Sequence, residues 1–293
     1  MSNKRRTVHF DIGKDDMKIA RVGLHNYEEP IISGKNGSGT IFFSGCNLKC
    51  VFCQNYEISH GKKGIDVSID TLKDLMLYLQ HIGAENINLV TPSLYVKSIA
   101  SALERAKIDG LNIPVVYNTS SYETVETLKI LDGLVDVYLP DFKYSDDDLA
   151  MRLSNAKNYS AVAFDAISEM KRQQPKDVFD GDMIKKGVVV RHLVLPDEYS
   201  NTVGVFKKIA QIDKDMLVSV MAQYFPTAAV SGTKYDRRLT DAEYDAAVDA
   251  FFEAGLSKGF SQDLESGIED YVPSFDLDEL AKILNDLPQL LKN

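Results

Sequence analysis

Residues 45–55 read Gly45-Cys46-Asn47-Leu48-Lys49-Cys50-Val51-Phe52-Cys53-Gln54-Asn55. It contains all three cysteines of the 293 residues, in a Cys-x3-Cys-x2-Cys spacing. Three cysteines packed so closely cannot form a disulfide framework. Cysteines used only for packing would be scattered along the chain, so this clustering indicates a metal site.

The three cysteines predict an incomplete ligand set for a four-iron cluster. Three thiolates on one short loop leave one iron of a cubane without a protein ligand, and the chain has no fourth cysteine. An open position is typical of catalysis, whereas clusters that only transfer electrons are usually closed by four cysteines. We therefore predict a [4Fe–4S] cluster on Cys46, Cys50 and Cys53. The alternative is zinc with His60 as fourth ligand, although structural zinc sites usually consist of two close ligand pairs.

Outward from this loop, apolar runs alternate with amphipathic stretches from about residue 38 to 221, as in successive βα units. The runs read as parallel strands buried on both faces. The predicted strands are Thr40–Phe43, Ile87–Val90, Val115–Tyr117, Val135–Leu139, Val188–Leu195 and Met216–Met221. The predicted helices are Thr71–Ile82, Val96–Ala106, Ser121–Leu131, Asp146–Glu169 (readable as two helices), Asn201–Ile212, Asp241–Ala254 and Leu277–Leu291. The cysteine loop then lies at the carboxyl end of the first strand, where βα barrels collect active-site loops.

The composition excludes several classes of function. Hydrophobic residues make up 44% and charged residues 26%, which is ordinary for a soluble chain. A net charge of −10 argues against a nucleic-acid partner, because phosphate binding needs a face rich in Lys and Arg. No apolar run approaches the ~20 residues that span a bilayer, and no apolar segment follows the basic start to make a secretory signal. We expect a cytoplasmic protein without a membrane partner.

The cysteine spacing, with aromatic Phe52 directly before the last cysteine, resembles the signature of the radical S-adenosylmethionine (SAM) superfamily. More closely, the chain resembles the activase-like relatives of pyruvate formate-lyase activating enzyme over roughly residues 20–255. The further stretches that carry this resemblance are residues 37–45, 88–93, 116–120, 138–143 and 190–196. The resemblance implies a partial (β/α)6 TIM-like barrel. Since the sequence has no internal repeat and no low-complexity linker, we predict a single domain, 1–293, with a core at about 38–225 and a helical extension at about 240–293. The resemblance also implies that SAM binds the open iron and is split to a 5′-deoxyadenosyl radical that takes a hydrogen atom from the substrate.

Polar residues behind the second and third predicted strands are candidates for binding SAM. Thr91 and Ser93 follow the second strand, where the superfamily often carries a Gly-Gly-Glu stretch that this chain lacks. The alternative there is a plain proline turn. Asn118 and Ser120 follow the third strand and suit ribose hydroxyls, or they cap the next helix.

Asp141 and Lys143 follow the fourth strand and match an Asp-Leu-Lys of the activating enzymes, in which the Lys lies near the SAM carboxylate. Residues i and i+2 of an extended segment point the same way, so the two can serve one ligand. The alternative is a surface pair. Further candidates for cofactor binding are Phe52, Asn55, His192, Gln223 and Tyr224. His192 also reads as a core residue of an apolar strand, and neighbouring Arg191 needs an acidic partner if it is buried.

Two reactions share this radical chemistry. The first takes a hydrogen atom from a glycine of a partner enzyme, as the resemblance to activases implies, and the second acts on a small molecule or another peptide. Without a cysteine-rich insert, the single cluster needs an external flavodoxin or ferredoxin as electron donor. We expect residues 1–36 and Ala150–Asp180 to cap the substrate mouth.

An alternative from another class of protein is a zinc-stabilised binding module without catalytic activity. An ordinary SAM methyltransferase would instead place a Gly-rich loop after the first strand.

Overall fold

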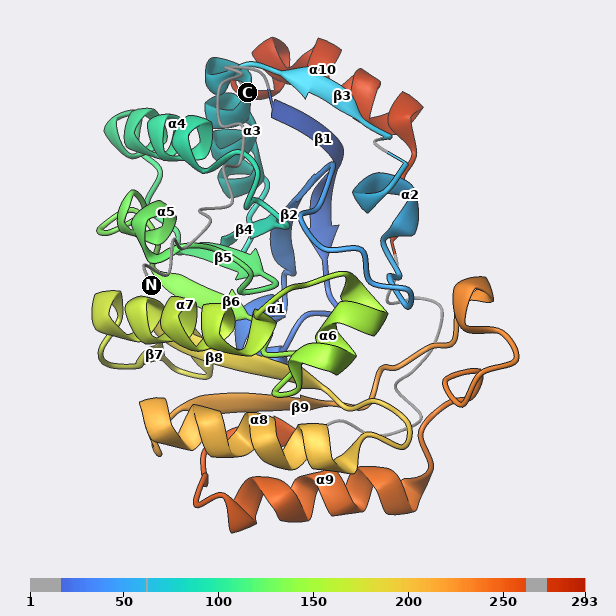
Figure 1. Ribbon diagram of the computed structural model, residues 1–293. Coiled ribbons are helices and arrows are strands. Elements are labelled where there is room, and N and C mark those ends of the chain that lie inside the picture. The colour runs from blue at the N-terminus through green and yellow to red at the C-terminus, as the bar shows by residue number, and fades with distance from the viewer. Residues whose placement is uncertain (1–16, 62, 262–272, 293) are drawn as a thin grey trace, which may run out of the picture.

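The computed structural model describes residues 17–61, 63–261 and 273–292. A mainly parallel sheet organises them (Figure 1). Its parallel neighbours are, in order, β2 (Ser38–Phe43), β4 (Ile87–Val90), β5 (Val115–Thr119), β6 (Val137–Pro140), β8 (Met183–Leu193), β9 (Leu217–Met221) and β10 (Gly259–Ser261). All six predicted strands are therefore confirmed, and β10 adds a parallel strand that the sequence analysis missed.

Helices in the crossovers cover the outer face of this sheet (Figure 1). They are α3 (Ile69–His81), α4 (Val96–Ile108), α5 (Val125–Lys129), α6 (Asp147–Ser154), α7 (Tyr159–Gln173), α8 (Tyr199–Ile212) and α9 (Asp241–Glu253). Local chemistry sets their starts: the Ser68 hydroxyl accepts from the Thr71 amide at α3, and Thr240 and Glu243 form a capping box at α9. The predicted stretch Asp146–Glu169 is two helices, α6 and α7.

Antiparallel strands and short elements complete the described chain. They are β1 (Met17–His25) beside β2, β3 (Ile65–Val67) beside β1, β7 (Val178–Asp180) beside β8, the short helices α1 (Pro30–Ser33) and α2 (Tyr56–Ser59), and the 3-10 turn Ala228–Val230. Helix α1 lies inside the curved sheet, against the amino ends of its parallel strands. Ile31 and Ile32 are buried there against Val116, Val137 and Val189 of the inner face.

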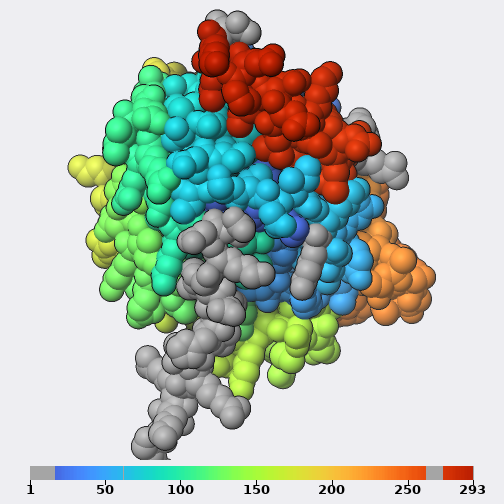
Figure 2. Space-filling view, turned by 90° about the horizontal axis from the view of Figure 1, so that it is seen from above, coloured from blue at the N-terminus to red at the C-terminus, as the bar shows by residue number. Residues whose placement is uncertain are grey.

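The carboxyl-terminal helix α10 (Leu277–Leu290) packs against α3 and β1. In Figure 2 it lies as a red band across the blue-to-cyan surface of the amino-terminal third. Within the described residues, no helix is long and apolar enough to cross a membrane.

Of the expected cap 1–36, residues 1–16 lie outside the described residues, and residues 17–36 form strand β1 and helix α1, with the turn between them reaching the site described below. The structure corrects two other expectations about elements. The predicted helix Ser121–Leu131 is shorter, because Ser121 has a left-handed φ of 61° and the true N-cap is Thr124. Residues Ala150–Asp180 do not line the cavity: the end of α6 contacts the cysteine loop, and α7 packs between α5 and α8 on the outer face.

Candidate active site

The cysteine loop follows β2 and is held by the end of helix α6. The amides of Lys49 and Val51 donate to the carbonyls of Ser154 and Leu153, at 2.9 and 2.8 Å. The Thr227 hydroxyl donates to the Val51 carbonyl at 2.6 Å. These contacts come from segments about 100 and 175 residues further along the chain, so the loop conformation depends on the whole fold.

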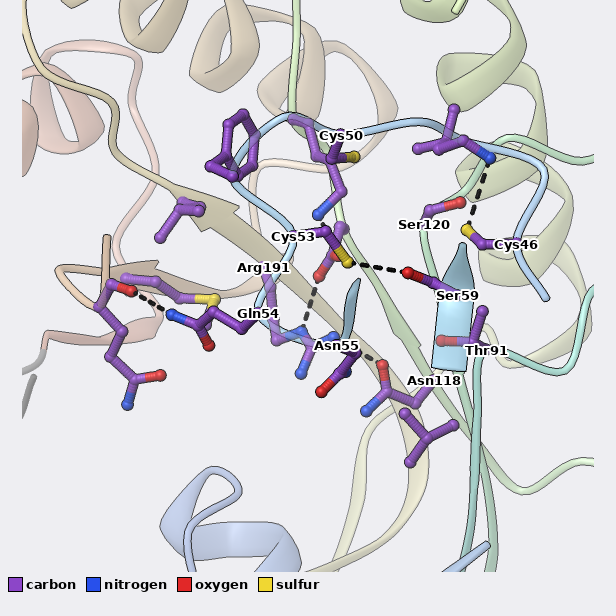
Figure 3. A pocket seen from close by; sticks show the side chains of 18 of the residues that line it. Cys46, Cys50, Cys53, Gln54, Asn55, Ser59, Thr91, Asn118, Ser120 and Arg191 are labelled. Carbon is purple, nitrogen blue, oxygen red and sulfur yellow. Dashed lines mark hydrogen bonds and ion pairs between the residues drawn. The ribbon is translucent and has the colours of Figure 1, made fainter. Parts of the chain in front are cut away.

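All three cysteines line one cavity of about 240 Å³ at the carboxyl edge of the sheet (Figure 3). The Ser154 hydroxyl donates to Cys50 Sγ at 3.0 Å, and the Ser59 hydroxyl lies 3.2 Å from Cys53 Sγ. Burial raises the pKa of Cys46 to about 12, and burial also raises the pKa of Cys50. Such thiols become thiolates when a metal centre takes up their charge. Three thiols that line one cavity and act on one another's charge are therefore candidate ligands of a single metal cluster.

The zinc alternative needs His60 beside the cysteines, and the structure does not place it there. The His60 ring stacks on Tyr56 with centroids 4.5 Å apart, its Nδ1 lies 2.9 Å from the Ser59 hydroxyl, and it does not line the cavity. Among residues 17–61, 63–261 and 273–292, no group of three or more His, Cys, Asp or Glu side chains is arranged to hold a single ion.

Arg191 on β8 is the centre of a buried polar network in the same cavity. Its guanidinium donates to Asp141 at 2.8 Å, to Asn118 at 2.6 Å and to Glu28 at 3.3 Å. The contact of Arg191 with Asn118 is visible in Figure 3. Arg191 thus ties together strands β5 and β8, the segment after β6 and the turn after β1.

Lys143 completes this network on the side of the cysteines. Its ammonium lies 2.6 Å from the Asp141 carboxylate. Burial alone would lower the pKa of Lys143, but the Asp141 charge holds it above the usual value. Burial would raise the pKa of Asp141, but Arg191 and Lys143 hold it below the usual value. Both groups are therefore charged, and the ammonium also acts on Cys46 and Cys50. A fixed cation beside the thiols suits a ligand carboxylate.

The turns after β4 and β5 are strained where they meet the cavity. Thr91 has a left-handed φ of 59°, which is rare for a β-branched residue, and its amide donates to the Asn118 carbonyl at 3.0 Å. The Ser120 hydroxyl is buried and has no partner among the described residues. Strain and an unpaired buried hydroxyl are features of ligand sites.

The cavity collects most of the predicted site residues. Those that line it are Cys46, Cys50, Phe52, Cys53, Asn55, Thr91, Asn118, Ser120, Asp141, Lys143, Gln223 and Tyr224. Two do not. Ser93 bonds instead to the buried Glu123 carboxyl. His192 faces the outer core, because strand alternation that turns Arg191 inward turns His192 outward. Its Nδ1 lies 2.8 Å from the Phe142 carbonyl and its Nε2 3.0 Å from the Thr202 hydroxyl.

Sequence reasoning expected residues 1–36 at the mouth but did not single out the residues around the turn after β1 that line the cavity. His25, Tyr27 and Glu28 line the cavity, and Glu28 pairs with Arg191. The sequence feature that could have pointed to this turn is a pair of acidic residues directly before a proline, Glu28-Glu29-Pro30. Leu193 and Met221 also line the cavity, and the alternation of their strands could have placed them there.

Together, a mainly parallel sheet, a cavity at its carboxyl edge and three convergent cysteines define an α/β fold built to hold a thiolate-bound cofactor. The chain belongs to the radical SAM superfamily, whose family model matches residues 40–201. Membership implies SAM and an iron–sulfur cluster as cofactors and points to an enzyme.

An uncharacterized protein of Methanocaldococcus jannaschii is 36% identical over 237 residues, which cover 77% of this chain and 64% of that protein. The chain therefore spans slightly less than two thirds of that relative.

Among solved structures, the fold is similar to that of SuiB from Streptococcus suis bound to S-adenosylmethionine, with a TM-score of 0.52 and 13% identity, covering 75% of this chain and 48% of that one. Methylornithine synthase gives a TM-score of 0.51 at 14% identity, covering 83% and 79%. The FeFe-hydrogenase maturase of Carboxydothermus hydrogenoformans gives 0.50 at 14% identity, covering 83% and 63%. At these identities the likeness concerns the fold alone.

Proposed function

We propose that this protein is a radical SAM enzyme in which Cys46, Cys50 and Cys53 hold one [4Fe–4S] cluster and SAM occupies the adjoining cavity. The observation that supports it most is that all three thiols and the Lys143–Asp141 pair line one cavity. When bound, the cluster and SAM supply a 5′-deoxyadenosyl radical that abstracts a hydrogen atom from the substrate.

The chain's own residues bind and orient SAM. The Lys143 ammonium is held toward the thiols by Asp141 and suits the SAM carboxylate. Asn118 and the unpaired hydroxyl of Ser120 offer hydrogen bonds to ribose hydroxyls. Phe52 and Tyr224 pack edge to face, with centroids 5.8 Å apart, and form one wall. The Tyr224 hydroxyl donates to the Tyr235 carbonyl, so Tyr224 contributes its ring.

Apolar side chains shield the opposite walls from water. Phe42, Val90, Leu193, Met221 and Phe225 line the cavity beside the polar groups. Excluding water strengthens each polar contact and protects a reactive radical from side reactions.

For the substrate, the resemblance to activating enzymes favours the glycine of a partner enzyme. The alternative is a small molecule or another peptide. In either case an external flavodoxin or ferredoxin supplies the electron, since the chain has no cysteine beyond the three. We place the protein in the cytoplasm.

The test is anaerobic reconstitution with iron and sulfide, followed by SAM and dithionite, with 5′-deoxyadenosine measured by mass spectrometry. We expect about four irons per chain and deoxyadenosine formation, both lost in Cys50→Ala. Glu104→Gln, at an exposed position of α4, is the matched control and retains both. A Cys50→Ala variant that kept its iron and its SAM cleavage would contradict the assignment. A wild-type protein that binds zinc but no iron would contradict it too.

A further inference from the structure

Each of the three cysteine sulfurs has a hydrogen-bonding neighbour. The amide two residues further along the chain donates to Cys46 Sγ at 3.4 Å. The Ser154 hydroxyl donates to Cys50 Sγ at 3.0 Å. The Ser59 hydroxyl lies 3.2 Å from Cys53 Sγ (Figure 3). The contact at Cys50 is the shortest of the three, and its serine is 0% exposed, so water does not compete for this sulfur.

A second hydroxyl lies behind the one that touches Cys50. The Tyr144 hydroxyl is 2.6 Å from Ser154 Oγ, and the Tyr144 side chain is also 0% exposed. A sulfur that binds metal is a thiolate and has no hydrogen to donate. The single hydroxyl hydrogen of Ser154 points at the sulfur, so Tyr144 donates to Ser154 Oγ in turn. Hydrogen bonds in such a series strengthen one another, and more so in a buried place of low dielectric constant.

Backbone hydrogen bonds fix Ser154 and Cys50 relative to one another. The amides on either side of Cys50 donate to the carbonyls of Ser154 and of the residue before it, at 2.9 and 2.8 Å. Asn155, with a left-handed φ of 51°, ends helix α6 directly after Ser154. The hydroxyl therefore meets the sulfur in a geometry that the backbone holds, and removing the hydroxyl alone leaves those backbone contacts in place.

Hydrogen bonds to cysteine sulfurs act on the reduction potential of a bound iron–sulfur cluster. Reduction adds one electron, taken from the external donor, and part of the added negative charge spreads onto the sulfurs. A hydroxyl hydrogen stabilises that charge, so it raises the potential. The same stabilisation acts on the free thiol: burial raises the pKa of Cys50, and the hydrogen bond from Ser154 opposes that rise.

We propose that Tyr144 and Ser154 set the reduction potential of the cluster through Cys50 and make the cluster easier to reduce. The inference rests on the proposed function for the cluster itself. Neither residue lines the cavity, so both act as positioning residues that touch neither SAM nor substrate. Their effect on the potential is therefore separable from SAM binding.

The test is a redox titration of the full-length, cluster-reconstituted protein under argon and without SAM. Dithionite supplies the electron, and the EPR signal of the reduced cluster reports the midpoint potential. Ser154→Ala removes the hydrogen bond to sulfur, so the equilibrium constant for reduction should fall about tenfold, which is a shift of about 59 mV to more negative potential for one electron. Tyr144→Phe removes only the second hydroxyl and should shift the potential in the same direction by less. Iron content should stay at the wild-type level in both variants.

Ser160→Ala is the matched control. Ser160 is a buried serine at the start of α7, and its hydroxyl has no partner among the described residues, so its removal should leave the potential unchanged. A Ser154→Ala protein with full iron content and the wild-type potential would overturn the inference, because a merely structural hydroxyl affects stability or iron uptake but not the potential of the assembled cluster.

If Ser154→Ala does not fold or binds no iron, Tyr144→Phe decides in its place, and an unchanged potential in that variant overturns the inference. The two levels of the argument fail differently in this experiment. A wild-type cluster whose potential does not respond to these hydroxyls removes this inference alone, whereas a wild-type protein that assembles no iron–sulfur cluster removes the proposed function.

Discussion

Among single residues, Arg191 shows how hydrogen-bond acceptors compensate the desolvation cost of a buried charge. A guanidinium without partners in a protein interior costs several kcal/mol, but here three acceptors from three elements surround it. Its position also holds Asp141, which in turn holds Lys143 next to the thiols. The charge next to the candidate SAM site therefore depends on a chain of side-chain contacts.

Lys143→Ala tests the last residue in this series of side-chain contacts. Removing the ammonium should weaken SAM binding about tenfold or more, because a charge-assisted contact is lost. Iron content should stay at the wild-type level, since the thiols remain. Equilibrium binding of SAM and iron analysis measure the two effects, and Lys97→Ala on the exposed face of α4 is the control. Unchanged SAM affinity in Lys143→Ala would refute this role.

His192 makes stability depend on pH. Burial lowers the pKa of His192 to about 4, against 6.5 for the free side chain, because the ring is enclosed between Phe142 and Thr202. Between these values the unfolded chain binds a proton that the folded chain does not. His192 therefore contributes stability that is present above pH 6.5 and is lost as pH falls toward 4, by about 3 kcal/mol.

The histidine Cε1 proton resonance of His192 should accordingly not titrate until pH is near 4, while urea unfolding shows the falling stability. A His192 resonance that titrates near pH 6.5 would contradict the buried, neutral assignment.

At the scale of elements, α6 and α10 have different tasks. The end of α6 shapes the cysteine loop through backbone hydrogen bonds, and its last residue, Ser154, touches Cys50. Helix α10 covers α3 and β1 and buries Leu280 and Leu287. We expect changes in α6 to disturb the site, and changes in α10 to disturb stability.

Leu280→Ala tests this division. Leu280 is 1% exposed, so its truncation should lower the free energy of unfolding by about 2–5 kcal/mol through lost burial and a cavity. Iron incorporation at low temperature should be unaffected, since α10 does not line the cavity. Urea unfolding of Leu280→Ala, beside exposed Lys282→Ala on the same helix, provides the measurement. A loss no larger than that of Lys282→Ala would mean that α10 adds no stability.

At the scale of the whole molecule, the described strands do not form a closed barrel. The strand order runs from β10 to β3, and these two strands are its ends. Around the cavity, residues of β2, β4, β5, β8 and β9 meet the turn after β1 and the cysteine loop. The site therefore assembles only when the sheet is complete.

Local patterns along the chain identify the class of this protein. Continuous apolar runs identified the six parallel strands, because their burial on both faces leaves a local trace, and cysteine spacing identified the loop. The sequence also placed Asp141, Lys143 and Asn118 correctly, since the residues that end parallel strands meet at one edge.

Only the tertiary structure decided the rest. It separated inward Arg191 from outward His192, since an apolar strand buried on both faces does not show which face is inner. It brought Glu28 from the turn after β1 to the wall of the cavity, and Ser154 from α6 to Cys50. Such contacts join residues far apart along the chain. Their energies depend on packing that no local pattern of side chains records.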